Sequence, residues 1–198
     1  MVMRNKGLLW VRTGWLLAAL LLYPFPLHAA DLYEVDHVHS SIVFRIKHLE
    51  IAYVYGRFND FSGTFRIDDN NPANNTIEIQ VKAKSIDTAN AKRDAHLRSP
   101  DFFDVKQFPL ISFNSKSFKT EGSDLFEVAG DLSLHGITHP LTIKVERTGS
   151  GRDPWGGYRV GFEGTFRVNR SEFGMSHMLG PVGDEVRLTV SLEAIRKS

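Results

Sequence analysis

Apolar and polar residues alternate along most of the chain after residue 30. In TIEIQVKAK, residues 76–84, the side chains of Ile77, Ile79 and Val81 fall on one face, and polar side chains fall on the other. A period of two residues is typical of a β-strand with one buried and one exposed face. The same pattern predicts further strands at 41–48, 59–68, 110–119, 125–134, 141–148, 158–169 and 185–195.

Short segments rich in Gly, Pro, Asn and Asp separate these strands, at 68–75, 120–124, 135–140 and 149–157. Such residues favour tight turns. About eight strands joined by short turns predict an all-β domain, either an antiparallel sandwich or an up-and-down barrel. A short run at 31–35 predicts an additional edge strand.

One segment departs from the alternation. Asp87 or Thr88 can cap a short helix over ANAKRDAHLR, residues 89–98. Ser99-Pro100 should end that helix, because the residue before a proline is pushed away from the α-helical region. The same pair could also begin a second turn. We therefore expect one helical insertion, which would cover one mouth if the strands close into a barrel.

The first 30 residues have the pattern of a secretory signal peptide. Three basic residues precede an uninterrupted apolar run at 15–22, and two alanines stand just before Asp31. The run is shorter than the ~20 apolar residues that span a bilayer. We expect a cleaved signal peptide at 1–30, a mature domain at 31–198 and a periplasmic location.

Charge and cysteine content narrow the function classes. Removal of 1–30 takes three of the 24 basic residues and leaves 21 against 23 acidic ones. A nearly neutral domain without a basic stripe argues against nucleic acid as a partner. The chain has no cysteine, which excludes disulfides, thiolate metal ligands and a cysteine nucleophile.

Signatures of catalysis are absent from the sequence: there is no GxSxG elbow, HExxH motif or phosphate-binding loop. His37 and His39 would share a face of a strand, and His135 and His139 flank a turn. Neither pair has a third ligand at a spacing typical of a metal site. We therefore expect no catalytic residue, no metal and no cofactor. An enzyme that acts on a lipid-linked substrate near His96 remains an alternative.

Phenylalanine is abundant, with 14 residues in the chain, and many of them occupy alternating strand positions. These side chains could form a solid core, or they could line the cavity of an eight-stranded barrel that holds one apolar ligand. In the second case, the predicted lining consists of Phe44, Ile46, Phe65, Ile79, Val81, Phe113, Leu132, Phe162, Phe166 and Leu188.

The helical insertion carries a dense run of charges, RDAHLRSPDFFDVKQFP, at 93–109. We predict that Arg93, His96 and Arg98 lie at the barrel mouth, where cationic donors could meet a polar or phosphorylated head group. The alternative is a lid held by local ion pairs, in which these charges contribute little to binding.

Three long motifs, HLRSPDFFDVKQFPLISF (96–113), GDLSLHGITHPLTI (130–143) and DPWGGYRVGFEGTFRVNRSEFGM (153–175), resemble the YceI-like family of exported proteins. The resemblance covers residues 31–197. It implies an extended, lipocalin-like antiparallel β-barrel of about eight strands with one short helical insertion. It also implies a non-enzymatic protein that binds a polyisoprenoid or similar long amphipathic lipid in the periplasm, for transport, storage or sequestration.

Some relatives in that family are fused to, or encoded beside, membrane b-type cytochromes. The resemblance therefore points to isoprenoid quinones or their precursors as ligands and to a quinone pathway partner. Exposed edges or hydrophobic mouths in such barrels would support a homodimer. An envelope stress or interaction protein with a packed core and no ligand is the alternative function.

Overall fold

The computed structural model describes residues 30–197, so the predicted signal peptide lies outside the described residues apart from Ala30. Its one α-helix is α1 (Ala91–Leu97), and short 3-10 helices cover Pro72–Asn74, Ala83–Ser85 and Arg170–Phe173. The strands are β1 (Asp31–Val35), β2 (Ser41–His48), β3 (Ala52–Phe58), β4 (Phe61–Ile67), β5 (Thr76–Lys82), β6 (Ile86–Asp87), β7 (Leu110–Thr120), β8 (Leu125–Leu134), β9 (Ile137–Arg152), β10 (Tyr158–Asn169) and β11 (Val182–Arg196). No helix among these residues is long and apolar enough to cross a membrane.

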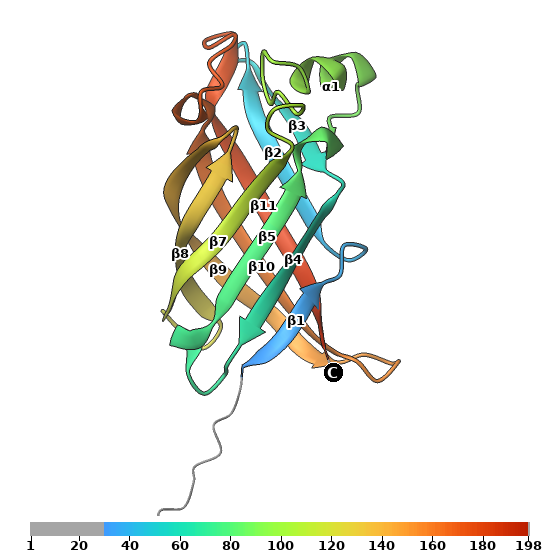
Figure 1. Cartoon of the computed structure of the whole chain (residues 1–198), viewed down its shortest axis with the longest axis vertical. Coiled ribbons are helices and arrows are strands. Elements are labelled where there is room, and N and C mark those ends of the chain that lie inside the picture. Colours follow the sequence, from blue (N-terminus) through green and yellow to red (C-terminus); the bar gives the residue numbers. More distant parts are fainter. Residues whose placement is uncertain (1–29, 198) are drawn as a thin grey trace, which may run out of the picture.

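Eight antiparallel strands form a closed ring in the order β1-β4-β5-β7-β8-β9-β10-β11, and β11 pairs back to β1 (Figure 1). The predicted all-β barrel of about eight strands with one short helical insertion is therefore confirmed. β1 was expected at an edge, and this expectation is wrong: Tyr33 lies opposite Phe65 of β4 on one side and Arg196 of β11 on the other. The short N-terminal strand closes the barrel.

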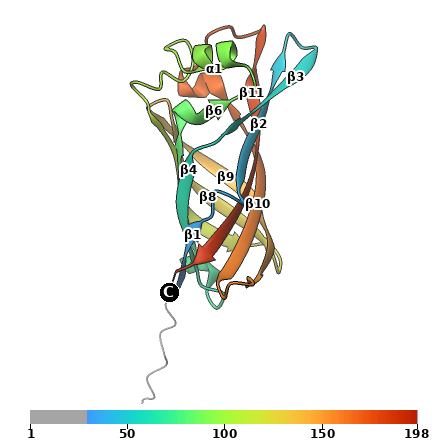
Figure 2. The ribbon, with the colours of Figure 1, turned by 90° about the vertical axis from the view of Figure 1, so that its right-hand side faces the viewer.

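The remaining three strands extend from one side of the ring. β11 is long enough to pair with β1 near its C-terminal end and with β2 over residues 182–191. β3 then pairs with β2, and β6 pairs with the end of β3. Figure 2 shows β2 and β3 at the same end of the molecule as α1, which lies across the top of the barrel. We call this the lid end, and we call residues 83–109, which connect β5 to β7, the lid segment.

Several predicted boundaries are wrong for identifiable reasons. β3 was not predicted, because Tyr53 and Tyr55 are exposed on its outer face and hide the alternation. β9 begins at Ile137, before the predicted 141, because His135 and Gly136 alone form the turn that follows β8. It also continues past 148 to Arg152, through the segment whose glycines had predicted a turn.

The predicted helix cap is also wrong. Asn90, rather than Asp87 or Thr88, is the N-cap of α1, and its Oδ1 accepts a hydrogen bond of 3.0 Å from the backbone N–H of Arg93. The second turn at Ser99-Pro100 is present: the Ser99 carbonyl accepts from the backbone N–H of Phe102 at 3.1 Å, and the Ser99 hydroxyl accepts from the backbone N–H of Asp101 at 3.3 Å.

A cluster of ion pairs stabilises the connection between β1 and β2. The Arg159 guanidinium donates to Asp36 at 2.7 Å and to Asp153 at 2.8 Å, and it also contacts Glu193. His39 completes the surroundings of Asp36, with 2.8 Å between its Nδ1 and the carboxylate. The hydrogen bonds from His39 and Arg159 hold the pKa of Asp36 well below its ordinary value, against the opposing effect of burial. This cluster ties the β1–β2 junction to β10 and β11.

We predict that D36N makes the protein less stable near pH 7 and removes part of its acid sensitivity. Because the folded pKa of Asp36 is depressed, its contribution is fully present above the unfolded value and is lost as pH falls below about 4. Urea denaturation at about pH 7 and about pH 3 should show a wild-type advantage that shrinks at the lower pH. E78Q, which changes an exposed carboxylate on β5, is the control. An undiminished difference at the lower pH would contradict the assignment.

Candidate ligand cavity

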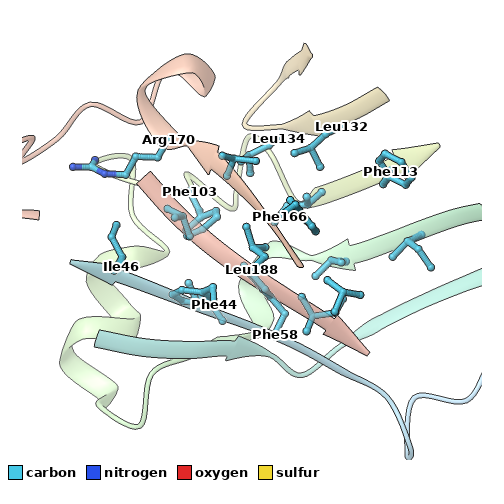
Figure 3. A pocket seen from close by; sticks show the side chains of 18 of the residues that line it. Phe44, Ile46, Phe58, Phe103, Phe113, Leu132, Leu134, Phe166, Arg170 and Leu188 are labelled. Carbon is cyan, nitrogen blue, oxygen red and sulfur yellow. The ribbon is translucent and has the colours of Figure 1, made fainter. Parts of the chain in front are cut away.

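The interior of the barrel holds a cavity of about 380 Å³ that reaches the lid segment (Figure 3). This is within the range of small-molecule pockets, roughly 300–1,000 Å³. Most of the lining side chains are aliphatic or aromatic. The ten residues predicted from the alternation all lie in this lining: Phe44, Ile46, Phe65, Ile79, Val81, Phe113, Leu132, Phe162, Phe166 and Leu188. Their contact with a ligand stays a prediction.

The register of the strands explains why these side chains converge. Residues directly opposite each other on neighbouring antiparallel strands point to the same face of a sheet. Leu188 on β11 lies between Phe166 on β10 and Phe44 on β2. Period-two alternation on a closed ring therefore brings residues from distant parts of the sequence to one apolar surface.

A second row of the same kind lies across the ring. Phe113 on β7 lies between Ile79 on β5 and Leu132 on β8. Opposite Phe44 stands Gly56, where a Cβ atom would lie 2.3 Å from the phenylalanine ring. Only glycine leaves space for that ring to lie over β3 at the cavity wall.

The end of the barrel opposite the lid is filled by side chains. Phe162 packs edge-to-face on Phe65, with ring centroids 5.5 Å apart, and contacts Phe126 at 6.4 Å. The Arg147 guanidinium lies 5.5 Å from the Phe126 ring centroid and donates to Asp69 at 2.9 Å. Further buried residues outside the cavity lining are Tyr33, Val35, Ile67, Phe118, Val160 and Ala194. The cavity therefore has a packed floor, and the lid end is the natural route of entry.

The lid segment presents apolar side chains to the cavity and satisfies its own polar groups locally. Leu97, Phe102 and Phe103 line the cavity from above. Beneath α1, the buried Asp94 carboxylate accepts from the backbone N–H of Thr88 at 2.9 Å and from its hydroxyl. Buried polar groups need such partners, so this loop can cover an apolar interior at little cost.

The three predicted mouth residues have different positions. Arg93 and His96 line the cavity, and both are largely exposed. Arg93 donates from Nε to the Thr88 hydroxyl at 2.7 Å and from Nη2 to the Thr88 carbonyl at 2.6 Å. His96 pairs with Asp101, with 2.8 Å between Nε2 and Oδ2.

Arg98 does not line the cavity. Its Nε donates to the Lys84 carbonyl at 2.7 Å and its Nη2 to the Ile86 carbonyl at 2.5 Å. The side chain thus ties the end of α1 to the beginning of the lid segment. Both of these donors are engaged by backbone carbonyls of the lid, and contact of Arg98 with a ligand head group stays a prediction.

Arg170 is a cavity residue that was not predicted from the sequence. It is nearly fully buried, with 4% of its surface exposed, and lies at the lid end of the cavity (Figure 3). Its guanidinium donates to four backbone carbonyls: Gly183 at 2.9 Å, Met175 at 2.6 Å, His177 at 2.8 Å and Val182 at 3.0 Å. Burial lowers its pKa. The alternation could have predicted this position, because residues 166, 168 and 170 are two apart and therefore face the same side of the sheet, toward the interior.

We predict that R170M destabilises the fold and loosens the connection between β10 and β11. Loss of the guanidinium leaves four carbonyls without their donor, and the expected cost is about 3 kcal/mol, since one unsatisfied buried group costs about 1–3 kcal/mol. Urea denaturation and hydrogen exchange across 174–183 would measure the effect. R170K, with three donors instead of five, should be intermediate. Equal stability of R170M and wild type would contradict this role.

Known proteins of similar sequence and structure agree with this architecture. A family model described as the YceI-like domain matches residues 33–194. A UPF0312 protein of Pseudomonas aeruginosa is 46% identical over 171 residues, which cover 85% of this chain and 88% of that protein.

Two solved structures share the fold. BcnA of Burkholderia cenocepacia superposes with a TM-score of 0.74 at 23% identity, over 80% of this chain and 98% of BcnA. A polyisoprenoid binding domain from Saccharophagus degradans, implicated in plant cell wall breakdown, superposes with a TM-score of 0.66 at 15% identity, over 86% of this chain and all of that domain. The family model and the 46% identical relative together show that the chain belongs to the YceI-like domain family.

Proposed function

We propose that this protein holds a polyisoprenoid or similar long amphipathic lipid inside its barrel, with an isoprenoid quinone or its precursor as the favoured ligand. The apolar cavity of about 380 Å³ is the observation that carries the proposal. The alternative of a packed, ligand-free core predicts that side chains fill the whole interior. They fill only the end opposite the lid.

The chemistry of the wall favours a chain that lacks polar groups along most of its length. Burial of apolar surface stabilises a bound ligand by ~25 cal/mol per Å², or about 0.8 kcal/mol for each methylene, and requires no polar contact with the wall. The polyisoprenoid binding domain that shares this fold supports the same ligand class. Because that domain is only 15% identical, the ligand assignment rests on the cavity of this chain.

The lid end would receive the polar end of the ligand. In Arg93, Nε and Nη2 are bound to Thr88, while Nη1 forms no hydrogen bond with any described residue. This donor on a cavity-lining residue could bind a hydroxyl, a quinone carbonyl or a phosphate. The head group would thus lie under the lid and the chain would extend toward the floor.

A periplasmic location and a quinone pathway partner, such as a membrane b-type cytochrome, complete the proposal. The signal peptide pattern at 1–30 supports the location. In that compartment the protein would carry, store or sequester a lipid that is poorly soluble in water, and no bond of the ligand would change.

We expect L188W to block binding, because a large indole would occupy the space between Phe44 and Phe166. T189W is the matched control, since the neighbouring side chain is exposed on the outer face of β11. Competition titrations, in which farnesol, geranylgeraniol and a longer polyprenol displace a fluorescent geranylgeraniol analogue, should show affinity rising roughly tenfold or more per isoprene unit until the cavity is full. Equal affinity of L188W and T189W for each alcohol would contradict the proposal.

We expect R93Q to weaken binding of geranylgeranyl phosphate several-fold more than binding of geranylgeraniol, because a charged donor favours an anionic oxygen. R98Q, which alters a lid arginine outside the cavity, is the control for general loosening of the lid. The same titrations measure both ligands. If R93Q loses affinity for the phosphate and for the alcohol to a similar degree, Arg93 stabilises the lid and does not bind the head group.

A further inference from the structure

Three potential metal ligands meet at the mouth of the cavity. His96 comes from α1, Asp101 from the turn that follows it, and His177 from the connection between β10 and β11. One donor atom from each lies within 4.8 Å of the other two, and all three residues are exposed. His96 also lines the cavity. Elements far apart in the sequence therefore bring two imidazoles and a carboxylate together beside the cavity opening.

The spacing of these donors suits a first-row transition metal. Tetrahedral Zn²⁺ with bonds of about 2.0–2.1 Å holds its ligand atoms roughly 3.3 Å apart. The Nε2 of His96 and the Oδ2 of Asp101 are 2.8 Å apart, and a ring nitrogen of His177 lies within 4.8 Å of the donor atoms of both residues. Small side-chain rotations would place an ion between them, with a further coordination position open. Imidazole nitrogen is a ligand that Zn²⁺, Cu²⁺ and Ni²⁺ favour.

The surroundings fix the two imidazoles. Phe102 is buried beneath them, and its ring lies edge-on to His96 at 5.0 Å and to His177 at 5.2 Å. Arg170 donates to the His177 carbonyl at 2.8 Å and so holds the backbone of that loop in place. An apolar shell beside a metal site limits the access of solvent to it. Asp184 lies near enough to Arg170 to offset part of its charge.

The charge balance distinguishes this cluster from the second one of its kind. Asp36, His39 and Glu193 also bring their donor atoms within 4.8 Å of one another. There the Arg159 guanidinium already contacts both carboxylates and takes the place of a cation. Among the described residues, by contrast, no lysine or arginine forms an ion pair with Asp101. The mouth cluster thus has a carboxylate available for a metal.

We propose that His96, Asp101 and His177 form a divalent transition-metal site of the zinc class, which clasps the lid to the β10–β11 connection. A bound ion would cross-link α1 to a loop on the other side of the opening. That part of the proposal rests on the proposed lipid-binding function, because the clasp would slow the entry and exit of the lipid. Metal binding itself is independent of any lipid.

Isothermal titration calorimetry of the purified protein with ZnCl₂ tests the site directly. One Zn²⁺ ion per chain should bind saturably, and H96A and H177A should each weaken binding roughly tenfold or more. H39A, in the cluster that Arg159 already fills, is the matched control and should leave this binding unchanged. Absence of saturable Zn²⁺ binding, or identical binding by H96A, H177A and wild type, would overturn the proposal. Urea denaturation without metal checks that the variants are folded.

The clasp has a separate readout. Protein loaded with a fluorescent geranylgeraniol analogue would be mixed with phosphatidylcholine vesicles, and transfer of the probe followed with and without Zn²⁺. Zinc should slow transfer several-fold in wild type and in H39A but not in H177A. Saturable Zn²⁺ binding with an unchanged transfer rate would overturn the clasp and support only the metal site. Failure of the apo protein to take up the probe would instead contradict the lipid-binding function, while calorimetry still decides on the metal.

Discussion

Closure of the sheet through β1 is the constraint on which the rest of the structure depends. This strand of five residues pairs with β4 on one side and β11 on the other, and so joins the two edges of a ring of eight. Once the ring is closed, every inward position of the alternating pattern faces a common interior. An eight-stranded ring has an interior just wide enough for side chains or for one ligand. In this barrel, side chains fill one end and leave a cavity at the other.

A cavity with an apolar wall requires a cover whose polar groups are already satisfied. The lid segment meets this requirement with the Asp94 carboxylate, which binds Thr88, and with Arg98, which binds the carbonyls of Lys84 and Ile86. Arg170 does the same for the β10–β11 connection from the opposite side. Many of the charged side chains at the mouth therefore stabilise the conformation of the lid segment and the β10–β11 connection. Shape and length of the cavity, more than polar recognition, would select the ligand.

The alternation along the strands predicted the barrel and its lining well, because period two determines which side chains face inward whatever the order of the strands. The ten predicted lining residues follow from that phase alone. What the pattern could not show is which strands meet. The pairing of β1 with β11 joins residues near the two ends of the described chain, and local sequence carries no signal for it.

The contacts of the charged side chains at the mouth could not be predicted from the sequence, for a physical reason. A charged residue in a loop can reach a ligand, a backbone carbonyl or water, and its choice depends on contacts between distant segments. Arg98 donates to a backbone carbonyl of the lid segment. Arg170, just after β10, donates to a backbone carbonyl of the β10–β11 connection. The inward phase of residue 170 was visible in the sequence. The meeting of His96 with His177 was not, since it requires the folded β10–β11 connection.

Native mass spectrometry of the protein purified from its native host tests the central claim most directly. Release under organic solvent should yield one long, apolar chain molecule per protein chain, and its mass would distinguish a quinone from a polyprenyl alcohol or phosphate. L188W purified in the same way should carry none. Recovery of wild-type protein without any bound lipid, together with failure to load it with polyprenols in vitro, would contradict a lipid-holding barrel.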